Sequence, residues 1–336
     1  MNLKKEKLIM IEYKSSAIRM WSILGSRGAF GVALNELAQS HPEIIALSAD
    51  LCTTSGLDRF KNSYPDRFVN VGIAEQNMVG IAAGMASMSY IPFATTFSNF
   101  ASLRSCEQMR HFMGYMKENV KIVGLGAGFA MGMFGVTHYG LEDIASIRAI
   151  PNITILSPAD CTETVKMTQK ALEIKGPVYL RLTGVMNAPI IYKKDYEIEI
   201  GKTIPLSNGD DLTIFATGSM VNEALKASEI LKTQGISAAV EDVHTIKPLD
   251  TEAIERACSK KMIVTIEEHS VIGGLGSAVS ETLSRIAKHP MQLTIGVENN
   301  YPKAGSYQYL VNFCGLSADS IAEKIKKKYK EVNRDE

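Results

Sequence analysis

Short apolar runs alternate with longer amphipathic segments along most of the chain. Runs of β-branched and apolar residues bounded by polar turns predict buried strands, and apolar positions spaced three or four apart predict helices. Strands separated by helices favour a parallel sheet with right-handed crossovers. In the first half we expect strands at 44–48, 68–71, 91–93, 120–125 and 178–181, and helices at 28–39, 74–88, 104–116 and 158–174.

The segment 192–209 interrupts this alternation with charged and irregular sequence, and a second alternation follows it. The pattern therefore predicts an α/β protein of two doubly wound domains with mostly parallel sheets. We expect an N-terminal lead-in at 1–17, a first domain at 18–191, a linker at 192–209 and a second domain at 210–336. In the second domain the expected strands are 212–216, 238–243, 262–267 and 293–297, and the expected helices are 220–233, 251–258, 275–288 and 318–330.

The start of the helix expected at 158–174 carries a recognisable signal. Ser157 is a preferred cap residue, Pro158 suits the first helical position, and Asp160 supplies an acid three residues after the cap. The sequence therefore predicts that this helix begins at Pro158.

Composition excludes some classes of function. The chain has 336 residues, of which 46% are hydrophobic, and it balances 36 basic against 36 acidic residues. No overall field favours nucleic acid or an anionic membrane, although local basic residues can still meet small anionic substrates. No apolar run has the length of a membrane span, and residues 1–7 are too polar to lead a signal peptide. We expect a cytoplasmic protein that binds neither nucleic acid nor a membrane.

The cysteines indicate neither a disulfide framework nor a zinc site, because they are odd in number, scattered and without a CxxC pair. Cys52 lies in a candidate substrate loop. A packing role is the favoured interpretation for it, and a reactive thiol is the alternative. The five cysteines are Cys52, Cys106, Cys161, Cys258 and Cys314.

The most informative stretch, residues 71–86, places one acid at the start of a helix made of apolar and small residues. Taken alone, Glu75 is a first-turn acid that complements the helix dipole. The alternative is a carboxyl that shares a proton with the ring nitrogen of a heterocycle. Gly80 and Gly84 would allow another chain or element to approach the helix closely.

This stretch resembles the pyrimidine-binding domain of transketolases, and other matches to that family follow in the same order. The resemblance covers the chain from about residue 20 to residue 330. It rests on residues 26–27, 48–51, 71–86, 96–100, 135–138, 157–160 and 179–181, and in the second domain on 245–250 and 267–276.

The resemblance implies thiamine diphosphate as the cofactor. Glu75 would hydrogen-bond a ring nitrogen of the aminopyrimidine and act in a proton relay. Phe97 and Phe100 would form the aromatic pocket for that ring, although core packing is their simpler role. Asp50 and Ile73 would be further cofactor contacts. Leu103 stands where a third aromatic residue is expected.

The resemblance also implies a set of substrate contacts. His138 would be the second catalytic residue, donating hydrogen bonds to a sugar hydroxyl or a developing oxyanion. Arg27 and Arg181 would hold the phosphate of a sugar, for which a guanidinium offers a planar fork of donors. Surface salt bridges are the alternative for both arginines. Thr54 would be a further substrate contact.

Half of the cofactor site is missing from this chain. Thiamine enzymes hold Mg²⁺ beside the diphosphate with a Gly-Asp-Gly motif, and the nearest string, residues 208–211, lacks the second glycine. We therefore expect no metal ligands here and a separate N-terminal subunit that carries the motif. Two copies of each chain would form a heterotetramer, with this chain pairing through Gly80 and Gly84, and the chain would be inactive alone.

The loop 126–134 lacks the polar and acidic residues that transketolases place near the donor sugar, and it carries Met133 and Phe134 instead. The expected reaction is transfer of a two-carbon ketol unit from a phosphorylated or otherwise anionic ketose to an aldose. The alternatives are a β subunit of a 2-oxoacid dehydrogenase-like or deoxyxylulose-phosphate-synthase-like enzyme, and a noncatalytic scaffold.

The glycines at 273–276 follow an expected strand but lack the spacing of a nucleotide-binding fingerprint. Close packing of a helix accounts for them. Glu268 and His269 lie beside these glycines, and we expect a structural or interface role for both.

Overall fold

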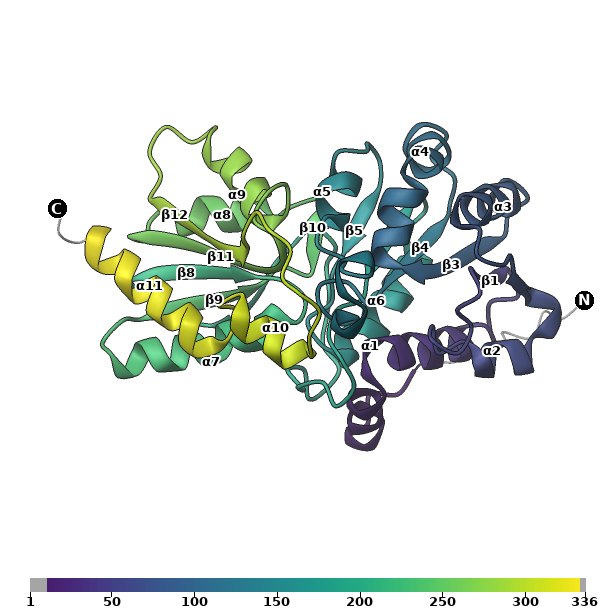
Figure 1. Cartoon of the computed structure of the whole chain (residues 1–336), viewed down its shortest axis with the longest axis horizontal. Helices are drawn as coiled ribbons and strands as arrows, with labels where there is room; N and C mark the ends of the chain where they lie inside the picture. Colours follow the sequence, from purple (N-terminus) through teal and green to yellow (C-terminus); the bar gives the residue numbers. More distant parts are fainter. Residues whose placement is uncertain (1–10, 333–336) are drawn as a thin grey trace, which may run out of the picture.

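Two mostly parallel sheets with helices on both faces lie end to end along the molecule (Figure 1). The computed structural model describes residues 11–332, and both expected doubly wound domains are present in it. The strands are β1 Ile44–Ser48, β2 Phe68–Asn70, β3 Ile91–Phe97, β4 Lys121–Leu125, β5 Thr154–Leu156, β6 Val178–Arg181, β7 Ile204–Ser207, β8 Leu212–Ala216, β9 Ala238–Asp242, β10 Thr245–Lys247, β11 Met262–Ser270 and β12 Met291–Val297.

Helices connect the strands in the order that parallel pairing requires. The α-helices are α1 Ser15–Leu37, α2 Asp58–Ser63, α3 Glu75–Ser87, α4 Cys106–Gln108, α5 Asp143–Arg148, α6 Cys161–Glu173, α7 Met220–Thr233, α8 Thr251–Ala257, α9 Leu275–Leu283, α10 Tyr307–Phe313 and α11 Ala318–Val332. Wider π turns at Phe100–Arg104 and Met109–Tyr115 flank α4, so the helix expected at 104–116 is one run of mixed helical turns. None of the helices between residues 11 and 332 is long and apolar enough to cross a membrane.

The first sheet has the strand order β10-β5-β6-β4-β3-β1-β2, and the second has the order β12-β11-β8-β9-β7. Apolar side chains of α1 and α6 pack on one face of the first sheet, and those of α3 and α5 pack on the other. The core between the sheet and helices α3 and α5 continues through β10 into α8 and α9 of the C-terminal domain. The two domains therefore share buried apolar surface.

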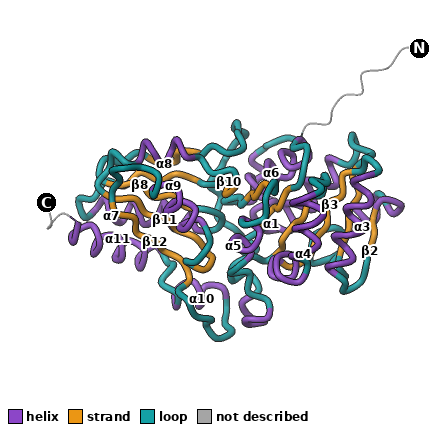
Figure 2. Tube along the Cα trace, turned by 90° about the horizontal axis from the view of Figure 1, so that it is seen from above, coloured by secondary structure: helices purple, strands orange, loops and turns teal. Residues whose placement is uncertain are grey.

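The strand β10 comes from the C-terminal half of the chain, but it belongs to the sheet of the first domain. It pairs antiparallel with β5, with Thr245 opposite Leu156, and both views place it at the junction between the domains (Figures 1 and 2). The Nζ atom of Lys247 donates a hydrogen bond to the carbonyl of Arg148 at 2.9 Å. The hydrophobic pattern predicted neither β5 nor β10.

The expected linker also contains regular structure. Its last residues form β7, which pairs antiparallel with β9 as an edge strand. Tyr192 and Tyr196 stack with ring centroids 4.0 Å apart. Their hydroxyls donate to Asp242 Oδ2 at 2.6 Å and to Glu163 Oε1 at 2.9 Å. The segment is therefore fixed to both domains, and the exact boundaries at 192 and 209 stay a prediction.

Two expected helix starts are wrong. Helix α1 begins at Ser15, inside the expected lead-in, and bends at Gly25, where φ is +75°. Residues 1–10 of that lead-in and residues 333–336 lie outside the described part. Helix α6 begins at Cys161 rather than at Pro158, because the carboxylate of Asp160 is the cap and accepts from the amide of Glu163 at 2.8 Å.

Candidate cofactor and substrate site

The predicted site residues of the first domain follow the carboxyl ends of neighbouring parallel strands, which is where open α/β sheets bind ligands. Asp50 follows β1, Ile73 follows β2, Phe100 follows β3, and a loop carrying His138 follows β4. The fold brings these residues to one edge of one sheet, as the resemblance implied.

Glu75 is the first residue of α3 and is 5% exposed. Its Oε1 atom accepts a hydrogen bond from Arg104 Nη1 at 3.0 Å. The guanidinium of Arg104 also lies 3.6 Å from the centroid of the Phe100 ring, a cation–π contact. Arg104 thus joins the predicted catalytic acid to the predicted aromatic pocket, a role that the sequence analysis missed. The signal available was its position four residues after Phe100, which puts both side chains on one helical face.

The imidazole of His138 packs edge-on against both phenylalanines. Its ring centroid lies 5.4 Å from that of Phe97 and 5.3 Å from that of Phe100. Phe134 covers a further side of the imidazole, with ring centroids 5.0 Å apart. These rings form one cluster with Glu75 and Arg104.

His138 is held in an uncharged form within this cluster. Burial lowers the pKa of His138, and the nearby charge of Arg104 lowers it further. Nδ1 lies 2.9 Å from the hydroxyl of Thr137, and Asn99 Nδ2 donates to the carbonyl of Thr137 at 2.7 Å. At neutral pH the ring can therefore donate a proton from one nitrogen and accept at the other.

The carboxamide of Asn70 links Asp50 to Gly72, the residue before Ile73. The Oδ1 atom of Asn70 accepts from the amides of Asp50 at 3.0 Å and of Gly72 at 3.1 Å. Its Nδ2 atom donates to Asp50 Oδ1 at 3.0 Å. Both amides belong to residues with positive φ, +59° at Asp50 and +73° at Gly72. This brace holds Ile73, which is 75% exposed, two residues before Glu75.

Arg27 and Thr54 lie where α1 meets the loop after β1. The two segments touch closely, because a Cβ atom on Gly31 would fall 2.0 Å from the carbonyl oxygen of Gly56. Burial lowers the pKa of Arg27. Within residues 11–332, no hydrogen bond or ion pair of the structure involves its guanidinium. A half-buried cation without an anion is consistent with the predicted contact to an anionic substrate.

Arg181 does not occupy a substrate site, and the prediction that it binds a phosphate is wrong. Its side chain is fully buried. Nε donates to Asp143 Oδ2 at 2.8 Å, and Nη2 donates to the carbonyls of Gly140 and Glu268 at 3.1 and 3.0 Å. A substrate cannot reach a guanidinium that lies between the two domains, and the ion pair with Asp143 satisfies its charge.

The glycine run at 273–276 has a structural role. In α9 the amides of Leu275 and Gly276 donate to the carboxylate of Glu267, at 2.7 and 2.8 Å. A Cβ atom on Gly276 would lie 2.4 Å from Thr294 Cγ2, which confirms close helix packing. Among residues 11–332 no group of three or more His, Cys, Asp or Glu side chains is arranged to hold a metal. Cys52 is partly buried, and burial raises the pKa of its thiol.

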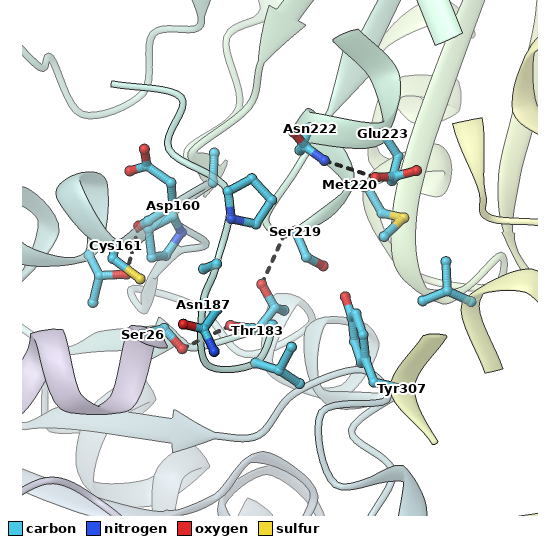
Figure 3. Close-up of a pocket in the computed structure, with 18 of the residues that line it drawn as sticks. Ser26, Asp160, Cys161, Thr183, Asn187, Ser219, Met220, Asn222, Glu223 and Tyr307 are labelled. Carbon is cyan, nitrogen blue, oxygen red and sulfur yellow. Dashed lines mark hydrogen bonds between the residues drawn. The ribbon is translucent and has the colours of Figure 1, made fainter. Parts of the chain in front are cut away.

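A cavity of about 260 Å³ lies at the junction of the domains, away from the Glu75 cluster. Figure 3 shows it between Ser26, Asp160, Thr183, Ser219 and Tyr307. The carboxylate of Asp160 is already occupied by the amides of Glu163, Ile191 and Tyr192. None of the predicted cofactor or substrate residues lines this cavity. On the loops that carry the predicted site residues, Ile73, Met133 and Phe134 are exposed.

Family models match both domains. Residues 24–184 match the pyrimidine-binding domain of transketolase, and residues 201–321 match the transketolase C-terminal domain. A Methanocaldococcus jannaschii protein described as a transketolase C-terminal section is 43% identical over 91% of this chain and 96% of its own length. The 6-deoxy-6-sulfo-D-fructose transketolase subunit SqwH of a Clostridium species is 42% identical over 86% of this chain and 89% of its own length.

Among solved structures, a split gene transketolase described as an inactive β4 tetramer superposes with a TM-score of 0.82. It is 40% identical and covers 91% of this chain and 98% of its own. These relatives are matched over nearly their whole length, and the matches include both domains and the cluster around Glu75. The chain therefore belongs to the transketolase family and corresponds to its pyrimidine-binding and C-terminal domains.

Proposed function

We propose that the chain is the C-terminal subunit of a split transketolase, a transferase that moves a two-carbon ketol unit from a ketose to an aldose. The observation that carries the proposal is the cluster at one sheet edge. It combines a buried acid at a helix start, two aromatic rings and an uncharged histidine. A noncatalytic scaffold has no need to assemble these groups.

The cluster fits the pyrimidine half of thiamine diphosphate. A carboxylate suits a ring nitrogen that carries a proton, and the Phe97 and Phe100 rings suit a flat heterocycle. Oε1 of Glu75 is bonded to Arg104, while Oε2 makes no hydrogen bond with residues 11–332. When bound, thiamine diphosphate supplies the nucleophilic carbon of the reaction. The diphosphate and its Mg²⁺ need ligands from another chain.

Each residue of the cluster has a chemical task in this proposal. Glu75 holds a proton at the pyrimidine ring, in a position set by Arg104. Phe97 and Phe100 exclude water from the heterocycle. His138 donates a hydrogen bond to the oxygen on which negative charge develops, because its neutral ring keeps one N–H available. Arg27 and Thr54 orient the anionic end of the substrate.

The surface around the cluster suits an N-terminal subunit bearing the Gly-Asp-Gly motif. Ile73, Met133 and Phe134, on the loops that carry predicted site residues, are 75%, 73% and 61% exposed, and exposed apolar side chains suit a protein interface. On α3, a Cβ atom on Gly84 would meet nothing within 4 Å of this chain. We propose that a second copy packs against α3 and that two N-terminal subunits complete a heterotetramer. A cytoplasmic location is part of the same proposal.

The substrate is expected to be a modified ketose with an anionic end group. Phe134 lies against His138, and neither Phe134 nor its chain neighbour Met133 can replace the hydrogen bonds of polar residues. The similarity to a subunit named for a sulfonated sugar supports an altered donor. Arg27 suits a sulfonate as well as a phosphate, because both present oxygens to a guanidinium.

The test is reconstitution with an N-terminal subunit, Mg²⁺ and thiamine diphosphate. The donors are xylulose 5-phosphate, deoxy, branched and sulfonated ketoses, and pyruvate, with a common aldose acceptor. We expect ketol transfer, favouring a modified ketose, and none from the Glu75→Gln complex. Turnover of pyruvate without ketol transfer would instead identify an enzyme of the 2-oxoacid dehydrogenase or deoxyxylulose-phosphate-synthase kind.

A further inference from the structure

The segment from Gly126 to Gly140, here called the His138 loop, is held at both ends by the C-terminal domain. The loop leaves β4 and closes on itself through a backbone bridge between Gly128 and Gly140, with N–H···O distances of 2.8 and 3.1 Å. His138 lies within it, two residues before Gly140. Whatever fixes these two glycines also fixes the position of His138.

The buried carboxylate of Glu268, on β11, reaches the first end of the loop. Oε1 accepts from the amide of Phe129 at 2.5 Å. Oε2 accepts from the hydroxyl of Tyr307 at 2.8 Å and from that of Ser219. Gly128 lies directly against this carboxylate, because a Cβ atom there would fall 2.3 Å from Oε1. Its φ of +68° also requires glycine.

The backbone of Glu268 is linked to the other end of the loop through Arg181. The carbonyl of Glu268 accepts from Arg181 Nη2, and that nitrogen also donates to the carbonyl of Gly140, at 3.0 and 3.1 Å. Further along, the hydroxyl of Tyr139 donates to the carbonyl of Lys303 at 3.1 Å. The amide of Gly305 donates to the carbonyl of Gly132 at 3.2 Å.

We propose that Glu268 is a positioning residue: it ties the His138 loop to the C-terminal domain and so sets where His138 lies relative to Phe97 and Phe100. A carboxylate suits this task because it accepts several hydrogen bonds, and bonds to a charged acceptor are strong. The structural part of the proposal stands on the contacts alone. Its consequence for turnover rests on the proposed function.

The next residue of the same strand provides a matched control. Glu267 is also fully buried, and its carboxylate also accepts two backbone amides. Those amides belong to Leu275 and Gly276 of α9, and no hydrogen bond joins the carboxylate to the His138 loop. Truncating either glutamate removes the same atoms from the same strand, but only the Glu268 variant loses a contact to the loop.

The first experiment measures amide hydrogen exchange in the isolated chain, without partner or cofactor. Glu268→Ala should accelerate exchange of the Phe129 amide and its loop neighbours roughly tenfold or more, the effect of losing a bond to a charged acceptor. Glu267→Ala should accelerate exchange at Leu275 and Gly276 and leave the loop unchanged. Glu268→Gln should restore most of the loop protection, because its amide oxygen can still accept from Phe129.

If Glu268→Ala does not fold, Tyr307→Phe decides the question. This variant removes one hydrogen bond from the carboxylate without touching the loop, and we expect faster exchange at Phe129 in it. Unchanged exchange in the Tyr307→Phe chain would then overturn the positioning role. So would equal acceleration of the loop by Glu268→Ala and Glu267→Ala.

The second experiment uses the reconstituted complex. Glu268→Ala should lower kcat about tenfold to a hundredfold, as expected when a catalytic group is displaced by about 1 Å. It should leave binding of thiamine diphosphate unchanged, and Glu268→Gln should recover most of kcat. An unchanged kcat in the Ala variant would overturn the catalytic part. Failure of the wild-type complex to transfer a ketol unit would overturn the proposed function, while the exchange experiment still decides the positioning role.

Discussion

Arg104 lies between Glu75 and Phe100, with Nη1 3.0 Å from the carboxylate of the one and the guanidinium 3.6 Å from the ring centroid of the other. The contact fixes Oε1 of Glu75 and leaves Oε2 for a ligand. The same positive charge contributes to the lowered pKa of His138. The Arg104 cation therefore holds the carboxylate of Glu75 and helps to lower the pKa of His138, the two residues that are predicted to be catalytic.

Replacing Arg104 with methionine should raise the pKa of His138 part of the way back to its usual value. The recovery is partial because burial, the larger cause of the shift, remains. NMR titration of the ring protons in the isolated chain measures it. Arg110→Met is the control, since Arg110 is exposed and pairs with Glu107. An unchanged His138 titration in the Arg104 variant would show that the charge does not reach the imidazole.

Removing the carboxylate of Glu75 should separate chemistry from assembly. In a reconstituted complex, Glu75→Gln should slow exchange of the thiazolium proton for deuterium by orders of magnitude, because the amide cannot take part in the proton relay. Sedimentation should still show the full complex. Rapid deuterium exchange in an intact Glu75→Gln complex would remove Glu75 from the mechanism.

The isolated chain should bind thiamine diphosphate weakly or not at all, because among its described residues no cluster of acidic, histidine or cysteine side chains can hold the metal. Adding an N-terminal subunit should produce tight, Mg²⁺-dependent binding. Titration calorimetry with and without that subunit measures both. Tight Mg²⁺-dependent binding by this chain alone would contradict the split arrangement.

Arg27→Ala should weaken anionic substrates selectively. The Michaelis constant for phosphorylated or sulfonated ketoses should rise roughly tenfold to a hundredfold, the effect of losing charge-assisted hydrogen bonds, while neutral sugars change little. Arg59→Ala, on the surface of α2, is the control. Equal losses on charged and neutral substrates would assign Arg27 to structure.

The acidic pair Glu163 and Asp242 should make stability fall as pH rises. Burial raises the pKa of both carboxyls, that of Asp242 to about 7. The folded chain therefore binds more protons than the unfolded chain, in which aspartate titrates near pH 4. The corresponding stability is complete below about pH 4 and is lost as pH rises through about 7.

Asp242→Asn keeps the shape of the side chain and can still accept a hydrogen bond from Tyr192. Because asparagine does not titrate, the free energy of unfolding should fall less between pH 5 and pH 8 in this variant. Urea unfolding midpoints at pH 5 and pH 8 measure it. Asp211→Asn is the control: the hydroxyl of Tyr329 helps to lower the pKa of Asp211, so its stabilisation is lost only below about pH 4 and this variant should keep the fall between pH 5 and pH 8. An equally large loss of stability between pH 5 and pH 8 in the Asp242 variant would show that another group causes the pH dependence.

The hydrophobic pattern predicted the order of most strands and helices, because long apolar runs in parallel sheets are buried on both faces. It missed the short strands β5, β7 and β10. Strand β10 also joins a sheet formed more than sixty residues earlier in the chain, and such pairing is decided by how the domains pack. Local sequence contains no trace of it.

The site residues also divide into those that local sequence reveals and those that only the fold reveals. Glu75, Phe97, Phe100 and His138 were recognisable because they lie in motifs, and the fold brings them together. Arg181 was misassigned although the strand around it reads as buried. A buried arginine needs an acid, and the acid is Asp143, 38 residues earlier on another element. Arg104 lies outside the motifs that resemble the family, and only its contact with Glu75 reveals its role in the site.

The placement of β10 limits where the polypeptide of this enzyme can be divided. A gene boundary within residues 192–209 would put β5 and β10 on different polypeptides. The first sheet would then end at an unpaired β5, and the buried surface shared through Ile246 would become exposed. An open strand edge of this kind invites aggregation. A division of the polypeptide between the two domains would therefore expose surface that the intact chain buries.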